Sequence, residues 1–304
     1  MTGTGDQADR QALSRRAFIR QGTLFLAGSA VLGNVAPRTL AAEGGTTPRV
    51  RIGLVTDMHY ADKPPTTSRY YRETLDKFAE AAKQLIAEKT DFLVELGDLI
   101  DSAASLDVEK GYLKRIFQEL RAVPGQHHCV FGNHCVQNVT KPEFLEIVGQ
   151  EKSYYSFDSR GYHFIVLDAC FRSDGQPYGR NNFQWTDSNV PPAEAEWLQA
   201  DLKATLHKAV VCIHQRLDME PPYGIKNAAA IRKTLEQSGK VLAVLQGHDH
   251  RGDYKEIGGV HYCTLRAMVE GSGKDNNAYA IMDILPDNSI QIRGFRKQKS
   301  YAWK

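Results

Sequence analysis

The clearest structural signal in this sequence is the stretch Ile52-Gly53-Leu54-Val55-Thr56-Asp57-Met58-His59. Its apolar first half, Ile52 to Val55, is typical of a buried strand. Side chains two residues apart on an extended segment point the same way, so Asp57 and His59 can converge on one ion while Met58 turns away. The stretch therefore predicts a strand whose end carries a pair of metal ligands.

The same arrangement recurs four times further along the chain. Asp98 follows the apolar run Phe92 to Leu96, Asn133 follows Val130-Phe131, His214 follows Val210 to Ile213, and His248 and His250 follow Val241 to Leu245. Ligands of open α/β sheets bind in the crevice beyond the carboxyl ends of the strands. We therefore expect all these side chains to gather at one edge of a sheet.

The chemistry of this set indicates two metal ions. Imidazole, carboxylate and amide oxygen together suit manganese, iron or zinc, and suit calcium poorly. Seven such groups exceed what one tetrahedral ion needs, whereas two ions about 3.5 to 4 Å apart would use them all and would activate a nucleophile for attack at phosphorus. Asp98 and Asp101 could face one side if their segment begins a helical turn, and then one carboxylate bridges the ions while the other organises the surrounding ligands.

The rest of the chain predicts an α/β fold, because short apolar runs alternate with longer amphipathic ones. Strands are expected over 50–56, 91–96, 128–131, 163–168, 209–213 and 241–246, and helices over 69–88, 106–121, 192–204 and 227–238. After His250 closely spaced strands are expected near 253–257, 260–265, 278–285 and 289–295, as a second, antiparallel layer. No linker interrupts the chain, so residues 43–304 are expected to form one domain.

Taken in order, the motifs D-x-H, G-D-x-x-D, G-N-H, a lone histidine and G-H-x-H resemble those of the calcineurin-like metallophosphoesterases, over essentially all of residues 50–250. The resemblance implies a double β-sandwich flanked by helices, in α/β/β/α layers. It implies one ion held by Asp57, His59, Asp98 and His250 and a second held by Asp98, Asn133, His214 and His248. It also implies in-line attack by a hydroxide that bridges the ions, with His134 stabilising the developing charge and protonating the leaving oxygen.

The C-terminal part of the sequence favours one class of substrate. Gly247 to His250, then Gly258-Gly259-Val260-His261-Tyr262 and Glu270, resemble the branch that includes manganese-dependent ADP-ribose and CDP-alcohol diphosphatases. One position departs from the family: the residue after G-N-H is usually acidic and here is Cys135. Either Cys135 is a small side chain that opens a helix, or its thiol leaves His134 a weaker acid and favours substrates with good leaving groups.

The first forty residues predict a targeting signal. The segment with two adjacent arginines, Ser14-Arg15-Arg16-Ala17-Phe18-Ile19-Arg20, precedes an uncharged stretch, Gly22 to Ala36. Together they resemble a bacterial twin-arginine export signal over residues 1–42. The apolar stretch is too short and too glycine-rich for a membrane span of about 20 residues. The alternative is an ordinary anchor helix. We expect residues 14–20 to engage the twin-arginine translocation machinery and the protein to be periplasmic or extracellular, or membrane-tethered if the signal is not cleaved.

Charge argues against a nucleic-acid partner. The formal net charge is +2, but residues 1–42 hold five arginines and two aspartates, a net of +3, so the remainder carries −1. A basic, nucleic-acid-binding body is therefore not expected. Five cysteines without CxxC pairing fit neither a disulfide framework nor a zinc ribbon, and all except Cys135 are expected as small buried apolar residues on strands.

Substrate contacts are expected from Arg180 and Asn181, in the long irregular stretch 171–191, and from Tyr60, which could stack on a base. Alternatively, Arg180 and Asn181 are solvated loop residues, and Tyr60 has a packing role. Three functions remain open: a hydrolase of phosphodiester or diphosphate bonds in small nucleotide-like or head-group substrates, an exported phosphomonoesterase, and a non-catalytic metal-binding scaffold. A scaffold has no need of His134, so that residue together with seven ligands favours a metal-dependent phosphoric ester hydrolase.

Overall fold

A computed structural model describes residues 18–20, 23–25, 47–180, 182 and 184–304 of the chain. The chain divides into two compact units, Met1–Glu43 and Gly44–Lys304. In the first, strands β1 (Phe18–Arg20) and β2 (Thr23–Phe25) form an antiparallel hairpin. Most of the export signal expected over residues 1–42 lies outside the described residues. None of the helices in the described ranges is long and apolar enough to cross a bilayer.

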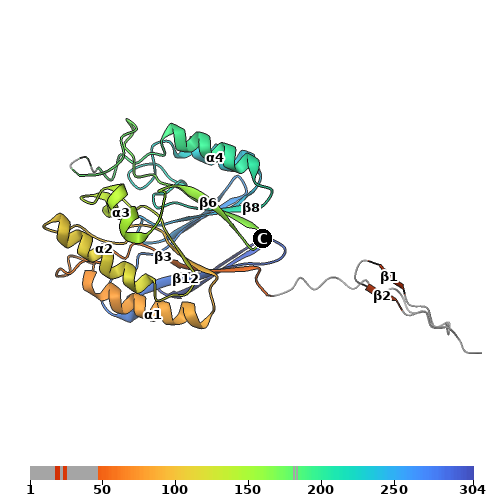
Figure 1. Ribbon diagram of the computed structural model, residues 1–304, viewed down its shortest axis with the longest axis horizontal. Coiled ribbons are helices and arrows are strands. Elements are labelled where there is room, and N and C mark those ends of the chain that lie inside the picture. Colours follow the sequence, from red (N-terminus) through yellow and green to blue (C-terminus); the bar gives the residue numbers. More distant parts are fainter. Residues whose placement is uncertain (1–17, 21–22, 26–46, 181, 183) are drawn as a thin grey trace, which may run out of the picture. The chain divides into compact units, whose positions relative to one another are not determined.

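The second unit is built on two six-stranded mixed sheets (Figure 1). One sheet has the order β14-β13-β12-β3-β4-β5, and its strands are β3 (Val50–Val55), β4 (Phe92–Glu95), β5 (Gln126–Cys129), β12 (Ala278–Ile284), β13 (Ile290–Arg296) and β14 (Tyr301–Trp303). The other has the order β10-β11-β9-β8-β7-β6, and its strands are β6 (Tyr155–Ser159), β7 (Tyr162–Val166), β8 (Lys208–Cys212), β9 (Val241–Gln246), β10 (Asp253–Ile257) and β11 (Val260–Thr264). Strands β3, β4 and β5 run parallel to one another, as do β7, β8, β9 and β11.

The two sheets pack face to face through alternate residues of their strands. Ile52 and Leu54 of β3 share one buried cluster with Val210 and Cys212 of β8, whereas Val55 contributes to a different cluster on the outer face. Successive side chains of a strand point to opposite faces, so each central strand is buried on both sides. This explains why their sequences are continuous apolar runs rather than alternating ones.

Helices cover both outer faces. Helices α1 (Thr74–Ala87), α2 (Leu106–Leu120) and α3 (Lys141–Val148) bury their apolar sides in the cluster outside β3 and β4. Helices α4 (Pro192–Ala204) and α5 (Ala228–Ser238) pack in the cluster outside β7, β8 and β9. Figure 1 shows α1 and α2 on one side of the paired sheets and α4 on the other. The expected α/β/β/α layers are therefore confirmed.

One expectation about the C-terminal strands is wrong. They do not form an antiparallel layer of their own, because β10 and β11 extend the sheet of β9, while β12, β13 and β14 extend the sheet of β3. Each group buries its apolar residues in the shared cluster between the sheets, which a separate layer would not reach. Strands β6 and β14 and helix α3 were not expected from the sequence, although Thr140 caps the N-terminus of α3 in a capping box with Glu143.

Candidate metal centre

The expected metal ligands lie in the loops that follow β3, β4, β5, β8 and β9. These strands belong to two sheets, so the ligands gather where the ends of the sheets meet and not at the edge of a single sheet. Backbone hydrogen bonds connect the loop after β3 to the loop after β4. Asp57 N donates to Gly97 O at 2.9 Å, and His59 N donates to Asp98 O at 2.8 Å. Gly247 N likewise donates to His214 O at 3.0 Å.

Backbone strain is concentrated at the ligands. Asp57, His59, Asp98 and His248 have φ angles of 49°, 44°, 56° and 69°, in the left-handed region that non-glycine residues rarely adopt. Such conformations cost about 1–3 kcal/mol each and persist where the surroundings over-determine them. The loops therefore hold these four residues in place at a cost in stability, which is typical of a functional site.

Two glycines let the ligand loops approach one another. A Cβ added at Gly132 would lie 2.0 Å from the backbone nitrogen of Asp98, and one at Gly247 would lie 2.2 Å from Thr56 Oγ1 and 2.7 Å from Asp57 Oδ2. No side chain fits at either position without moving a ligand. The glycines of G-N-H and G-H-D-H are thus required by close packing of the loops.

The ligand atoms converge on a small volume. His59 Nε2 lies 3.5 Å from Asp98 Oδ2 and 3.2 Å from His250 Nε2, and His250 Nε2 lies 3.4 Å from Asp57 Oδ1. On the other side His214 Nε2 lies 3.2 Å from Asp98 Oδ2. Asp57, His59 and His250 form one group with metal-ligand spacing, and Asp98, His214 and His248 form another. Asp98 contacts members of both groups, as the bridging carboxylate of a two-ion centre would.

Several buried atoms at this centre have no hydrogen-bond partner among the described residues. They are Asp57 Oδ1, Asn133 Oδ1, His214 Nε2 and His248 Nε2. A buried polar atom without a partner costs about 1–3 kcal/mol, so four at one place need a ligand to satisfy them. All four belong to the residues expected to bind metal, and their oxygen and imidazole chemistry suits borderline divalent ions. The donor set therefore fits two such ions.

The remaining atoms of the ligands are fixed by neighbours. The oxygen of Asp57 that faces away accepts from Thr56 Oγ1 at 2.6 Å and from His248 N at 3.1 Å. Nδ1 of His59 lies 3.2 Å from Asp101 Oδ2, and Nδ1 of His250 lies 2.6 Å from Glu270 Oε1. Such contacts to the second ring nitrogen orient a ligating histidine and fix its tautomer. Asp101 and Glu270 thus orient two ligands.

The buried carboxylates at the centre attract positive charge. Burial opposes protonation of His214, but the carboxylates of Asp98 and Asp57 raise its pKa to about 9. The pKa of His250 is likewise raised to about 9, against burial, by the neighbouring carboxylates of Asp57 and Glu270. Burial lowers the pKa of His248 to about 3, which keeps it in the neutral form that a metal needs. Metal ions can replace the protons that this excess of negative charge attracts.

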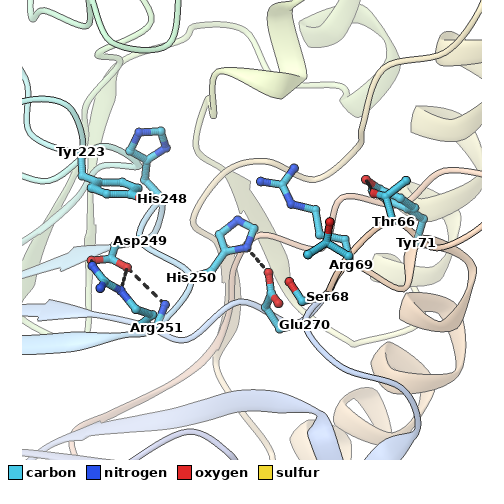
Figure 2. Close-up of a pocket in the computed structure, with 11 residues that line it drawn as sticks. Thr66, Ser68, Arg69, Tyr71, Tyr223, His248, Asp249, His250, Arg251 and Glu270 are labelled. Carbon is cyan, nitrogen blue, oxygen red and sulfur yellow. Dashed lines mark hydrogen bonds and ion pairs between the residues drawn. The ribbon is translucent and has the colours of Figure 1, made fainter.

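A cavity of about 520 Å³ opens beside the centre. Figure 2 shows His250 in its middle facing Glu270, with Tyr223 and His248 on one side and Arg69 on the other. Arg69 and Arg251 are the cationic side chains in its lining, and Arg69 Nη1 lies 3.5 Å from Asp101 Oδ2. Guanidinium groups match phosphate oxygens well, so the cavity suits an anionic phosphate ester.

The model of the calcineurin-like phosphoesterases matches residues 50–252, which span all seven expected ligands. The chain belongs to this family. As a calcineurin-like phosphoesterase it is a metal-dependent hydrolase of phosphoric esters that uses two divalent metal ions, and its buried donor atoms are placed accordingly.

Curated relatives of this phosphoesterase carry one name, manganese-dependent ADP-ribose/CDP-alcohol diphosphatase. The relative from Danio rerio is 25% identical over 80% of this chain and 94% of its own length, and that from Arabidopsis thaliana is 24% identical over 83% and 96%. Among solved structures, a dimetal phosphatase from Danio rerio superposes with a TM-score of 0.74 at 22% identity, over 85% of this chain and 99% of that one. A purple acid phosphatase from yellow lupin gives 0.51 at 13% identity, over 84% and 54%. The last two show that the fold is shared.

The expected acid of this phosphoesterase, His134, lies at the start of a short 3-10 turn, His134–Val136. Its ring packs edge-on against His59 at 4.7 Å between centroids, and its Nδ1 lies 3.7 Å from Asp101 Oδ2. Cys135 instead points into the core, where its Sγ accepts from Leu99 N at 3.3 Å and burial raises its thiol pKa. Of the two interpretations of Cys135, the structure supports the small side chain that opens a helical turn. Asp101 is the carboxylate beside His134.

Two of the three residues expected to contact substrate, Arg180 and Tyr60, lie away from the cavity. Arg180 pairs with Glu143 on α3 and donates to Asn138 O at 3.0 Å. Tyr60 is buried against Tyr112, with 5.8 Å between ring centroids, so it packs rather than stacks on a ligand. Neither lines the cavity, and Asn181 lies outside the described residues. Arg69 and Tyr223 do line the cavity, but no sequence motif marks either residue.

Proposed function

We propose that this enzyme is an exported, manganese-dependent diphosphatase that cleaves the diphosphate bond of nucleoside diphosphate-linked compounds such as ADP-ribose and CDP-alcohols. The observation that carries the proposal is the joint occurrence of the two-ion donor set and, directly beside it, a cavity with Arg69 in its lining. The shared name of the relatives supports the substrate class, because the match extends over four-fifths of this chain.

Each residue of the metal centre and its cavity has a separate role in the proposed reaction. Asp57, His59, Asp98 and His250 would hold one ion, and Asp98, Asn133, His214 and His248 the other. When bound, such a pair polarises the phosphoryl group and makes water a nucleophile near neutral pH. His134 lies at the rim of the centre, where it can donate a proton to the leaving phosphate oxygen, and the Asp101 carboxylate lies 3.7 Å from its Nδ1. Arg69 provides a fixed positive charge for the second phosphate.

The test is a hydrolysis screen of the manganese-loaded mature protein on ADP-ribose, CDP-choline, bis-p-nitrophenyl phosphate and p-nitrophenyl phosphate, with Asp98→Ala as the inactive control. We expect the two diphosphates to give the highest kcat/KM. A preference for p-nitrophenyl phosphate would indicate an exported phosphomonoesterase instead. Absence of turnover on all four substrates with two ions bound would indicate a scaffold.

Export through the twin-arginine route is the second part of the proposal, and it is supported by the Arg15-Arg16 pair and the weakly apolar stretch that follows it. Replacing both arginines with lysine should leave the precursor in the cytoplasm. Unchanged appearance of the lysine variant outside the cytoplasm would refute the proposed route without affecting the proposed reaction.

A further inference from the structure

Two aromatic side chains stand beside the metal ligand His248. The Trp185 ring lies 5.8 Å from the His248 ring between centroids, and the Tyr223 ring lies 5.6 Å from it. Trp185 and Tyr223 are themselves 5.8 Å apart, with their planes tilted by 50°. They come from different segments, Trp185 from the long loop before α4 and Tyr223 from the loop between β8 and α5. The fold thus brings two rings together at the edge of the centre.

Trp185 is exposed where an apolar ring would be expected to be buried. It is 38% exposed, one of four large apolar side chains exposed to this degree in the described ranges, together with Ile86, Val108 and Leu206. Its segment is nevertheless anchored, because Tyr178 Oη donates to Gln184 O at 2.6 Å and Ser188 Oγ donates to Trp185 O at 3.1 Å. An anchored, exposed indole beside a reactive centre is a candidate binding surface.

Tyr223 is fixed in the same way, since Arg216 N donates to its carbonyl oxygen at 3.1 Å. Its ring lines the cavity of about 520 Å³, which extends from Tyr223 and His248 past His250 to Arg69 (Figure 2). Trp185 stands against Tyr223 beside this cavity. Tyr223 therefore lies at one end of this cavity, His248 and His250 lie in its middle, and Arg69 lies at the other end with Tyr71 and Glu270 near it. A nucleotide has the same order of groups, a planar base joined through a sugar to its phosphates.

We infer that Trp185 and Tyr223 form a stacking platform for the nucleobase of the substrate. The inference rests on the proposed function and adds where the base binds and how it is recognised. With a base against these rings, the phosphates lie over His248 and His250 and extend toward Arg69. Stacking uses the π-face that every base has, so the platform accepts purines and pyrimidines alike.

The experiment compares two competitive ligands that differ only in the base. AMP and ribose 5-phosphate are titrated as inhibitors of the manganese-loaded enzyme, in wild type and in Trp185→Ala and Tyr223→Ala. Stacking contributes about 1–3 kcal/mol per base, so each alanine variant should weaken AMP binding by about fivefold or more while ribose 5-phosphate binds as before. Trp185→Phe and Tyr223→Phe keep a ring and should retain most of the AMP affinity. Leu206→Ala, at a side chain 95% exposed, is the matched surface control.

Tryptophan fluorescence gives a readout that needs no turnover. AMP should quench the emission of wild type and of Trp197→Phe, and should not quench that of Trp185→Phe. The inference is overturned if wild type binds AMP no more tightly than ribose 5-phosphate, or if the alanine variants weaken both ligands equally, as they would if the rings supported only the sugar or the loop. The proposed function fails separately, if the wild type hydrolyses neither diphosphate.

Discussion

Replacement of Arg216 by methionine should destabilise the protein and loosen its metal centre. The guanidinium is 2% exposed and touches three carboxylates, Asp218 at 2.6 Å, Asp249 at 3.0 Å and Asp253 at 2.6 Å. Asp249 lies between the ligands His248 and His250 in the sequence, so Arg216 fixes the loop that carries both. The variant would leave the buried carboxylates of Asp218 and Asp249 short of a partner.

The size of the effect follows from how much of the pairing survives. Removing one partner of a buried ion pair costs about 3–5 kcal/mol. Lys255 remains 3.5 Å from Asp218 and Arg251 remains 3.0 Å from Asp249, which places the loss at the lower end, about 3 kcal/mol. Asp253 is 42% exposed and contributes little. Because the loop carries two ligands, manganese affinity should also fall by roughly ten- to a hundredfold.

Urea unfolding of the metal-free protein measures the first effect and calorimetric titration with manganese measures the second. Arg160→Met is the matched control, because Arg160 is 63% exposed where it pairs with Asp91 and its loss should cost less than about 1 kcal/mol. Arg216→Lys keeps the charge but not the two-pronged contact with Asp218 and should restore only part of the stability. A methionine variant within 1 kcal/mol of wild type, with unchanged manganese affinity, would refute the reasoning.

Three further outcomes are expected. His134→Gln should lower kcat by about 10²–10⁴-fold while the content of bound manganese, measured by mass spectrometry, stays at the wild-type value; a loss of metal would make His134 a ligand. Gly247→Ala should reduce bound manganese, because the added Cβ meets Thr56 Oγ1 at 2.2 Å, and a fully loaded variant would contradict the packing argument. Burial lowers the pKa of His128 from 6.5 to about 4, so the folded state binds fewer protons than the unfolded state between these values. The free energy of unfolding should therefore fall by up to about 3 kcal/mol as pH drops from 6.5 to 4, and His128→Gln should remove that part of the slope in urea titrations at each pH.

The metal ligands could be named from the sequence because of how strands present side chains. Each ligand directly follows an apolar run, and an apolar run in an α/β protein is a strand whose end opens toward the ligand crevice. The ligand types, imidazole, carboxylate and amide oxygen, then restrict the bound metal to a few divalent ions. The helices over 106–120 and 192–204 were predicted almost to the residue for a similar reason, since the 3.6-residue period is a local property.

Contacts between segments far apart in the chain could not be read in this way. The sequence shows that β10 to β13 are strands, but the sheet that each joins depends on which apolar faces fit into the space between the sheets. Arg216 and Glu270 look like ordinary charged residues until folding places them against Asp249 and His250. Arg180 shows the reverse, because the tertiary fold turns a promising loop arginine toward Glu143.

The sequence by itself thus determined most of the elements and the candidate metal ligands, which depend on local periodicity and on residues adjacent to strand ends. Only the tertiary structure decided that the centre lies between two sheets and that Trp185 and Tyr223 meet beside His248. Pairing of distant segments is set by the burial of complementary surfaces, and no short stretch of sequence carries that information.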